Sequence, residues 1–230
     1  MEEIFFNSYD EDVAIYGDFE LPVPTYEINQ KIDFSVIVAL LLRSNVNTKT
    51  DSHRYIDYSK INKKAICEEC KISTKTLDRR LKYLEEKNIL TTKNTSRGLA
   101  YAINYSKDGK YYVVIHHRIL KNLLKYTNKD AIKVYILLKI QCDVLENKRP
   151  MSNAYLCTQL GYSPDSKKNL ENIGSWTNTL ANNGFIEKIQ NRVYTRNEDG
   201  KNVILRTDTY YKVNSIETWK TKSDKGVVKI

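Results

Sequence analysis

The segment from Ser73 to Leu84 combines basic, hydroxyl and aromatic side chains at helical spacing. Leu77, Leu81 and Leu84 recur at positions i, i+4 and i+7 of one helix face, and this spacing predicts that they are buried. The opposite face carries groups that can bind a polyanion: Lys75, Thr76, Arg79, Lys82 and Tyr83, with Ser73 at the helix entrance and Arg80 on the flank. Arginine can donate two hydrogen bonds to guanine, while lysine neutralises phosphate. This face therefore has the chemistry of a reader of the DNA major groove.

A second segment, which begins after Pro164 and ends at Asn182, repeats the pattern with less charge. Its predicted buried positions are Leu170, Ile173, Thr177 and Leu180. Its opposite face exposes Lys167, Lys168, Glu171, Asn172, Ser175, Asn178 and Asn182. Asparagine can bind adenine through two hydrogen bonds, but an Asn-rich face is also typical of an AT-rich genome. Two interpretations remain open: this segment also binds DNA, or it serves for dimerisation or protein binding.

A β-hairpin is predicted after each of these two helices. The first covers residues 89–105 with a turn at 94–98, and the second covers residues 185–213 with a turn at 197–201. Glycines in both turns supply the positive φ angles that tight hairpins need. The hairpins carry basic residues that can reach phosphate or the minor groove: Lys93 and Arg97 in the first, and Arg192, Arg196 and Lys201 in the second.

The elements before the hairpins also occur twice. The first copy has an extended stretch at 17–24, an apolar helix at 32–43, a short helix at 62–70, a turn at 71–73 and a long helix at 74–87. The second has an extended stretch at 109–116, a helix at 130–140 capped by 127–130, a short helix at 152–160 and a turn at 161–163. Ser73 and Ser163 suit helix entrances, because a side-chain oxygen there can accept an unpaired backbone N–H. The pattern predicts an α+β fold of two tandem domains.

The residues of both copies resemble a helix-turn-helix. The first match runs through Ala65, Ser73, the stretch 76–81 and Leu84, and the second through Leu156, Gly161, Ser163, Leu180 and the closing Asn-Gly-Phe-Ile at 183–186. With the extended lead-in and the hairpin, residues 17–213 are similar to winged-helix domains of replication initiators of Gram-positive plasmids and of phage replisome organisers. The second copy departs from the pattern by extra residues between its turn and its hairpin.

This resemblance implies two tandem winged helix-turn-helix domains, each with a three-helix core and a β-hairpin wing. They would occupy residues 17–106 and 107–213, between an acidic leader at 1–16 and a C-terminal tail at 214–230. The implied function is non-enzymatic, sequence-specific binding of double-stranded DNA by a plasmid or phage replication initiator or organiser. The alternatives are a transcription regulator of a mobile genetic element and a protein-binding scaffold in segregation or conjugation. A homodimer, or replication and segregation proteins, would be further partners.

The charge distribution agrees with a polyanionic partner. The chain has 37 Lys and Arg against 28 Asp and Glu, a net charge of +9. Residues 1–30 hold eight of the acids and no Lys or Arg, so the basic charge is concentrated in the rest of the chain. The acidic leader has two interpretations: a segment that docks on a partner or covers the basic face, or a solvated terminus without a role. If both copies bind one duplex, we expect a site of about 20 base pairs, because neighbouring major grooves lie ~34 Å apart.

Several other functions find little support in the sequence. The longest apolar run, Val36–Leu42, has seven residues, where a membrane span needs about twenty. The N-terminus lacks the basic and apolar regions of a secretory signal, and the four cysteines read as reduced thiols, so we expect a cytoplasmic protein. Phosphate-binding, hydrolase and zinc-protease motifs are absent, and we expect no cofactor and no catalytic site.

The residues with metal or redox chemistry are better explained by packing. Cys67 and Cys70 form a C-x-x-C without a second pair nearby, within a predicted helix. His116 and His117 are adjacent, and strand alternation predicts that they point to opposite faces. We expect His53 to be solvated in a polar loop. The two tryptophans, at positions 176 and 219, are also expected to pack in the core.

Overall fold

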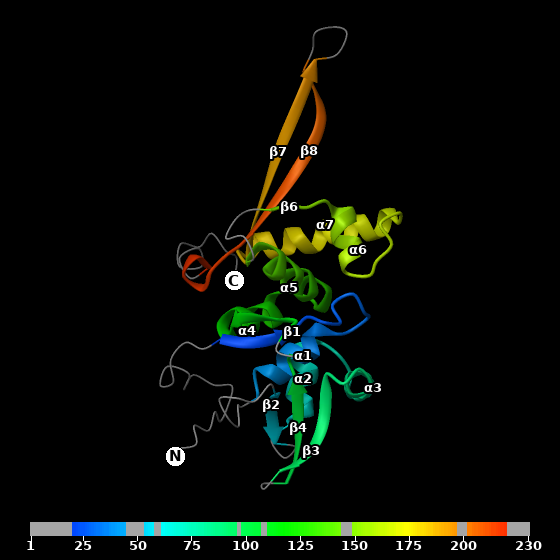
Figure 1. The fold of residues 1–230 in the computed structure, drawn as a ribbon, viewed down its shortest axis with the longest axis vertical. Coiled ribbons are helices and arrows are strands. Elements are labelled where there is room, and N and C mark those ends of the chain that lie inside the picture. Colours follow the sequence, from blue (N-terminus) through cyan, green and yellow to red (C-terminus); the bar gives the residue numbers. More distant parts are fainter. Residues whose placement is uncertain are drawn as a thin grey trace. The chain divides into compact units, whose positions relative to one another are not determined.

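Helices and small antiparallel sheets make up the computed structural model of the chain (Figure 1), so the α+β class is confirmed. The structure describes residues 20–44, 53–57, 61–95, 98–106, 110–143, 149–196 and 202–219. The acidic leader at 1–16, Arg97 and Lys201 lie outside the described residues.

The chain groups into two compact units. The first unit contains residues Met1–Glu27 and Ile32–Ile132, and the second contains Ile28–Lys31 and Lys133–Ile230. The border therefore lies between Ile132 and Lys133, whereas the repeat in the sequence divides at 106/107. Residues 107–132 group with the first unit because the strand and helix they form pair and pack with its N-terminal elements.

The first unit is built around an apolar helix, α1, whose eight residues are all buried. Two strands near the ends of the unit pair as an antiparallel sheet, β1–β5, and α1 packs against β1, α2 and α4. A second sheet has the strand order β2-β4-β3. The elements are β1 (Glu20–Pro24), α1 (Phe34–Leu41), β2 (His53–Asp57), α2 (Lys63–Cys70), α3 (Thr74–Glu86), β3 (Leu90–Thr95), β4 (Gly98–Asn104), β5 (Tyr112–His116) and α4 (His117–Tyr126).

The second unit repeats the order helix, strand, two helices and hairpin. Its sheet has the order β6-β8-β7, which matches β2-β4-β3 strand for strand. The far ends of its hairpin extend well beyond the helices of the same unit (Figure 1). The elements are α5 (Lys129–Asp143), β6 (Arg149–Pro150), α6 (Asn153–Gln159), α7 (Lys167–Asn182), β7 (Ile186–Arg196) and β8 (Asn202–Val213).

Three elements were not expected from the sequence: β2, β6 and α4. The loop predicted around His53 is wrong, because His53 begins β2 and pairs with Asn104 of β4. Buried Arg54 anchors this strand by donating from Nε to Ser44 Oγ at 2.7 Å and from a terminal nitrogen to Ser44 O at 2.8 Å. Burial lowers the pKa of Arg54 to about 10. Because arginine occupies this buried position, the sequence of β2 does not alternate between apolar and polar residues, which is the pattern that would have predicted a strand.

The entrance of α7 also differs from the prediction. Ser166, and not Ser163, caps the helix by accepting the Asn169 backbone N–H at 3.4 Å. Gly161 begins the turn at φ +77°, and the Ser163 carbonyl accepts a hydrogen bond from the Asn169 side chain at 3.0 Å. Pro164 lengthens the turn, so the capping position lies three residues later.

Residues 214–219 pack on the second unit. The Trp219 ring stacks on Phe185 at 6.1 Å, and its indole nitrogen donates to Asn183 O at 3.1 Å. The Asn214 side chain donates to Gly184 O at 2.7 Å. The start of the expected C-terminal tail thus closes one end of this unit's core, and Trp219 has the predicted packing role.

Candidate nucleic-acid interface

Helix α3 begins at a serine cap. Ser73 Oγ accepts the Thr76 backbone N–H at 3.3 Å and lies 3.0 Å from Thr76 Oγ1. Leu77, Leu81 and Leu84 are buried, as the helical period predicts. The cap fixes where the first turn starts, and the leucines fix which face of the helix is turned outward.

The outward face of α3 carries three exposed basic residues, Lys75, Arg79 and Lys82. Thr76 is half-buried, and its hydroxyl is engaged with Ser73. Half-buried Tyr83 lies beneath the Lys87 ammonium group, 5.8 Å from it. The structure therefore brings together most of the predicted binding residues of this helix. Their long, exposed side chains can reach an external polyanion.

One of the acidic residues on the exposed side of α3, Asp78, is paired with a lysine of α2. Asp78 Oδ1 lies 2.7 Å from Lys63 Nζ at the start of α2. This ion pair joins α2 and α3 and offsets the carboxylate next to Arg79. The potential over the outward face is correspondingly more positive.

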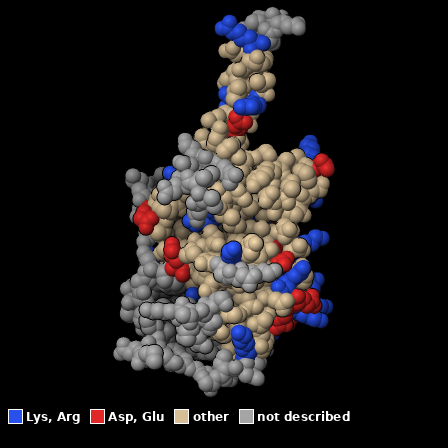
Figure 2. All heavy atoms as spheres, in the orientation of Figure 1, with Lys and Arg blue, Asp and Glu red and all other residues tan. Residues whose placement is uncertain are grey.

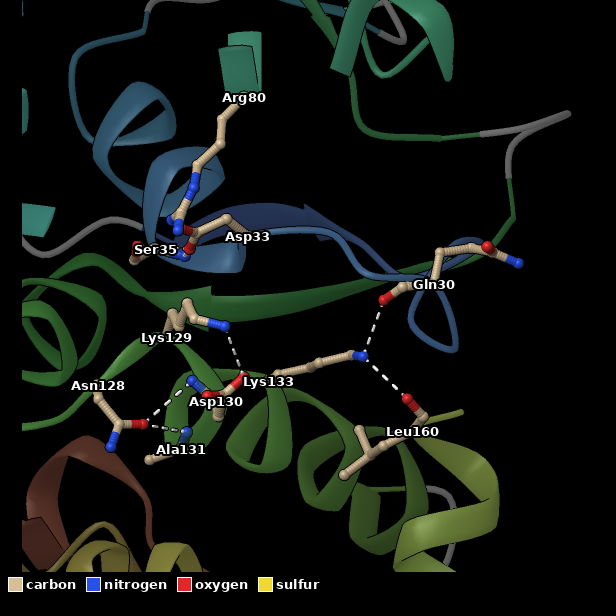
Figure 3. Close-up of polar contacts among 10 residues, drawn as sticks. All are labelled: Gln30, Asp33, Ser35, Arg80, Asn128, Lys129, Asp130, Ala131, Lys133 and Leu160. Atoms are coloured by element: carbon tan, nitrogen blue, oxygen red, sulfur yellow. Dashed lines mark hydrogen bonds and ion pairs between the residues drawn. The ribbon is translucent and has the colours of Figure 1, made fainter. Parts of the chain in front are cut away.

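Arg80 does not belong to this face. It forms an ion pair with Asp33, whose side chain is 5% exposed, while that of Arg80 is 23% exposed (Figure 3). Asp33 Oδ1 also accepts hydrogen bonds from Ser35 N at 2.9 Å and Ser35 Oγ at 2.5 Å, so it caps α1. Burial lowers the pKa of Arg80, although the negative charge of Asp130 acts in the other direction. Arg80 positions α3 on α1, a role its place on the helix flank did not reveal.

The first hairpin adds one described basic residue. Lys93 on β3 is exposed, and its ammonium group lies 5.7 Å from the centre of the Tyr55 ring on β2. The cation–π contact holds the lysine stem over the sheet and leaves the charge at the surface.

Helix α7 presents a more polar face. Lys167, Lys168 and Ser175 are exposed, and Asn172 is half-buried. Lys167 Nζ lies 3.9 Å from Glu171, an exposed pair that contributes little energy. Ile173, Thr177 and Leu180 are buried as predicted, whereas Leu170 is half-buried. The basic charge of this face is confined to the first turn of the helix.

Two polar residues of α7, Thr177 and Asn178, contact a lysine of β7 within the unit. Asn178 Oδ1 accepts a hydrogen bond from Lys188 Nζ at 2.8 Å, and Thr177 Oγ1 lies 3.1 Å from the same nitrogen. Burial lowers the pKa of Lys188. These contacts fix the base of the β7–β8 hairpin on α7.

The β7–β8 hairpin contains functional candidates that sequence reasoning missed. Arg192 and Arg196 are exposed as predicted, and Arg206 is also exposed, with its Nε 3.3 Å from Asp208. Large apolar side chains on the same hairpin are exposed too: Tyr194, Val203, Ile204 and Leu205. The sequence feature that could have revealed them is the unbroken apolar run at 203–205. In a hairpin with one face in solvent, apolar and polar residues should alternate, so such a run indicates exposed apolar side chains.

Lys133 is buried, so its charge does not contribute to the candidate interface. Lys133 Nζ donates to Gln30 O and to Leu160 O, each at 2.9 Å (Figure 3). The same nitrogen lies 5.2 Å from the centre of the Tyr162 ring. Both carbonyls belong to the second unit. Part of the chain's positive charge therefore serves internal packing.

The candidate metal and redox residues take part in packing contacts. Burial raises the pKa of the Cys70 thiol to about 11, which keeps it protonated near neutral pH. The prediction that His116 and His117 point to opposite faces is wrong, because His117 begins α4 and the two rings stack at 4.7 Å. His116 Nδ1 accepts the Arg118 backbone N–H at 3.2 Å. Across the described ranges, no group of three or more His, Cys, Asp or Glu could hold a metal ion.

The described helices are too short or too polar to span a membrane. Comparisons of the chain with protein-family models, with curated proteins and with solved structures find no match.

Proposed function

We propose that this protein binds double-stranded DNA in a sequence-specific manner through two tandem winged-helix units, as an initiator or organiser of plasmid or phage replication. The observation that carries the proposal is the outward face of α3, where Lys75, Arg79 and Lys82 are exposed opposite three buried leucines. An arginine in the first turns of such a helix can reach guanine, and the lysines can reach phosphates.

The repeated topology supports the same proposal. In both units a short strand pairs with the last strand of a hairpin, and a helix pair precedes that hairpin. This is the order of a winged helix, in which the second helix of the pair enters the major groove and the hairpin lies beside it. The exposed lysines at the start of α7 support a second, weaker contact.

Selection of bound sequences from random duplex DNA tests the proposal, followed by titrations with the selected site. The variant Lys75→Ala with Arg79→Ala should lower affinity at least about 30-fold, since each of the two base or phosphate contacts contributes on the order of 1–3 kcal/mol. The matched control is Lys121→Ala with Lys125→Ala, which removes the same charge from exposed positions on α4. Equal affinity of both double variants would overturn the proposed role of α3.

The selected sequence also separates the possible roles. Tandem copies of the site in an origin would support replication, whereas a single palindrome over a promoter would support transcription regulation. A protein that enriches no sequence from the random pool would instead be a protein-binding scaffold. Protection of about 20 base pairs, reduced by Lys167→Ala with Lys168→Ala, would show that both units bind DNA.

A further inference from the structure

The distal half of the β7–β8 hairpin exposes an apolar cluster of three residues. Tyr194, Ile204 and Leu205 are 55%, 51% and 64% exposed. Apolar patches of this kind on a soluble domain are typical of interaction sites, because burying them in a partner releases water from apolar surface. We call Tyr194, Ile204 and Leu205 the hairpin wedge.

Strand pairing places the wedge between two arginines. Tyr194 pairs with Ile204, Arg192 with Thr207 and Arg196 with Asn202. Positions i and i+2 of a strand share a face, as do cross-strand partners, so Arg192, Tyr194 and Arg196 line one face with Ile204 beside the tyrosine. Neighbouring members of this row lie ~7 Å apart along the strand. The result is an apolar pair with a guanidinium group on either side.

A β-bulge exposes the third member of the wedge. The pairing register shifts between Val193 and Tyr194, from Arg206 to Ile204, and leaves Leu205 without a partner opposite. Bulges increase local twist and redirect a side chain. Leu205 is the most exposed large apolar residue of the described chain, at the point where the ribbon twists.

The charge around the wedge favours a polyanion. The described residues 190–196 and 202–208 contain three arginines and one acid, Asp208, which lies 3.3 Å from Arg206 Nε and leaves Arg192 and Arg196 as the basic residues beside the wedge. In Figure 2 basic side chains lie along the hairpin, and an acidic side chain lies directly below one of them on the same hairpin. Over the whole stretch 186–213 the sequence has six basic and four acidic residues, two of the acids in the turn. The positive charge is thus concentrated beside the wedge.

We propose that the hairpin wedge inserts into the groove of duplex DNA and bends it, while Arg192 and Arg196 bind the flanking phosphates. This inference rests on the proposed DNA-binding function and adds a second activity to it. Proteins that bend DNA insert apolar side chains between base steps, and arginines beside them hold the backbone. A two-stranded ribbon is narrow enough to enter a groove.

The alternative occupants fit the charge less well. If two copies met through this face, the same face would lie on both sides of the interface, and arginines would oppose arginines. An anionic lipid surface would attract the arginines, but the described residues around the wedge form a narrow ribbon and not a broad amphipathic face. Both alternatives are outcomes of the test below.

The test measures ligase-catalysed cyclisation of a mixed-sequence DNA fragment of about 150 base pairs, one persistence length, so that no target site need be known. Wild-type protein should raise the cyclisation rate about tenfold or more, because a bend lowers the elastic cost of closing the circle. The variant Tyr194→Thr, Ile204→Thr, Leu205→Thr keeps β-formers in the strands. It should lose this acceleration and bind the linear fragment about tenfold more weakly.

The matched control is Val114→Thr, an apolar position on β5 that is 38% exposed. It should behave as wild type in cyclisation and in binding. Arg192→Gln with Arg196→Gln should instead lower the slope of log affinity against log salt by about two, because two phosphate contacts are lost. Circular dichroism melting checks that each variant is folded, and exposed positions should change stability by less than about 0.5 kcal/mol.

The outcomes separate this inference from the proposed function. If the wedge variant accelerates cyclisation as much as wild type does, the inference is overturned. It is also overturned if the only property that the wedge variant loses is dimerisation, measured as molecular mass, or binding to phosphatidylglycerol vesicles. If wild type binds DNA through Lys75 and Arg79 but never accelerates cyclisation, the inference fails and the proposed function stands. If wild type binds no duplex at 50 mM salt, both fail.

Discussion

Arg80 of α3 and Asp33 at the N-terminus of α1 form an ion pair in the interior of the first unit. Asp33 also caps α1 through Ser35, so one carboxylate fixes the start of one helix and the position of another. The outward face of α3 depends on this pair for its orientation, although neither residue lies on it.

Removal of Arg80 should destabilise the first unit. The variant Arg80→Ala leaves the buried Asp33 carboxylate without its counter-charge, which typically costs about 3–5 kcal/mol. Because Arg80 is partly exposed, we expect a loss near the lower end of this range. Urea denaturation measures the loss in the free energy of unfolding. The neighbouring substitution Arg79→Ala serves as the control and should change this free energy by less than about 0.5 kcal/mol. Equal effects of the two substitutions would contradict the structural role of Arg80.

Lys133 should be equally important in the second unit. Lys133→Met keeps most of the side-chain volume but leaves the carbonyls of Gln30 and Leu160 without their donor. Each unsatisfied buried group costs about 1–3 kcal/mol, so the two carbonyls could cost about 2–6 kcal/mol. Because the Lys133–Gln30 hydrogen bond is only part-buried, we expect a loss in the lower part of this range, about 2–4 kcal/mol of the free energy of unfolding. The exposed residue Lys168 of the same unit provides the control, as Lys168→Met. A Lys133→Met protein as stable as this control would show that the two carbonyls need no donor.

Two glycines should respond in opposite ways to alanine. At Gly161, with φ +77°, an added Cβ would overlap the Asn29 carbonyl group, closer than van der Waals contact allows, so the backbone must shift. We expect a loss of more than about 2 kcal/mol. At Gly174, inside α7, the added Cβ lies 3.5 Å from the nearest atom, Asn153 Nδ2. There alanine should stabilise by about 0.5–1 kcal/mol. Thermal melting of the two variants compares these effects, and a stabilising Gly161→Ala would refute the close approach.

Cys70 should be a poor nucleophile in the folded protein. Burial raises its pKa from 9.0 to about 11, so its thiolate fraction at pH 8 is about 100-fold lower than that of an unperturbed thiol. Iodoacetamide labelling with mass spectrometry should therefore modify Cys70 about 100-fold more slowly in native protein than in urea. Rapid native labelling at this site would contradict the burial.

The same shift in pKa fixes a pH dependence of stability. Because the folded state binds the Cys70 proton more tightly than the unfolded state, this contribution is fully present below pH 9 and is lost as pH rises towards 11. Unfolding free energies measured at pH 8 and pH 10, in wild type and Cys70→Ala, should show a smaller decrease in the variant.

Features with a strong period could be predicted from the sequence. The three leucines of α3 located that helix, and the turn at 197–201 located the β7–β8 hairpin, each to within a few residues. The helical period works because burial of one face dominates the energy of an amphipathic helix. The exposed residues Lys75, Arg79 and Lys82 followed from the same argument.

Features that depend on distant contacts could not be predicted. Arg80 lies on the flank of α3 in the helical period, and only the fold brings Asp33 to it. Strand β6 has two residues, too few for any alternation, and exists because β8 offers it a pairing edge. Similarly, His117 follows a strand in the sequence but begins α4, and this places its ring against His116 and not on the opposite face.

The four residues Ile28–Lys31 belong to the second unit although residues of the first precede and follow them. A single cleavage of the chain before Lys133 therefore cannot separate the second unit intact. The Gln30 carbonyl, which accepts a hydrogen bond from Lys133, and the Asn29 backbone, which packs against Gly161, would remain in the N-terminal fragment. During synthesis, this short piece leaves the ribosome about a hundred residues before the helix that will hold it. Completion of the second unit thus requires that the piece be kept accessible until the rest of the chain has been made.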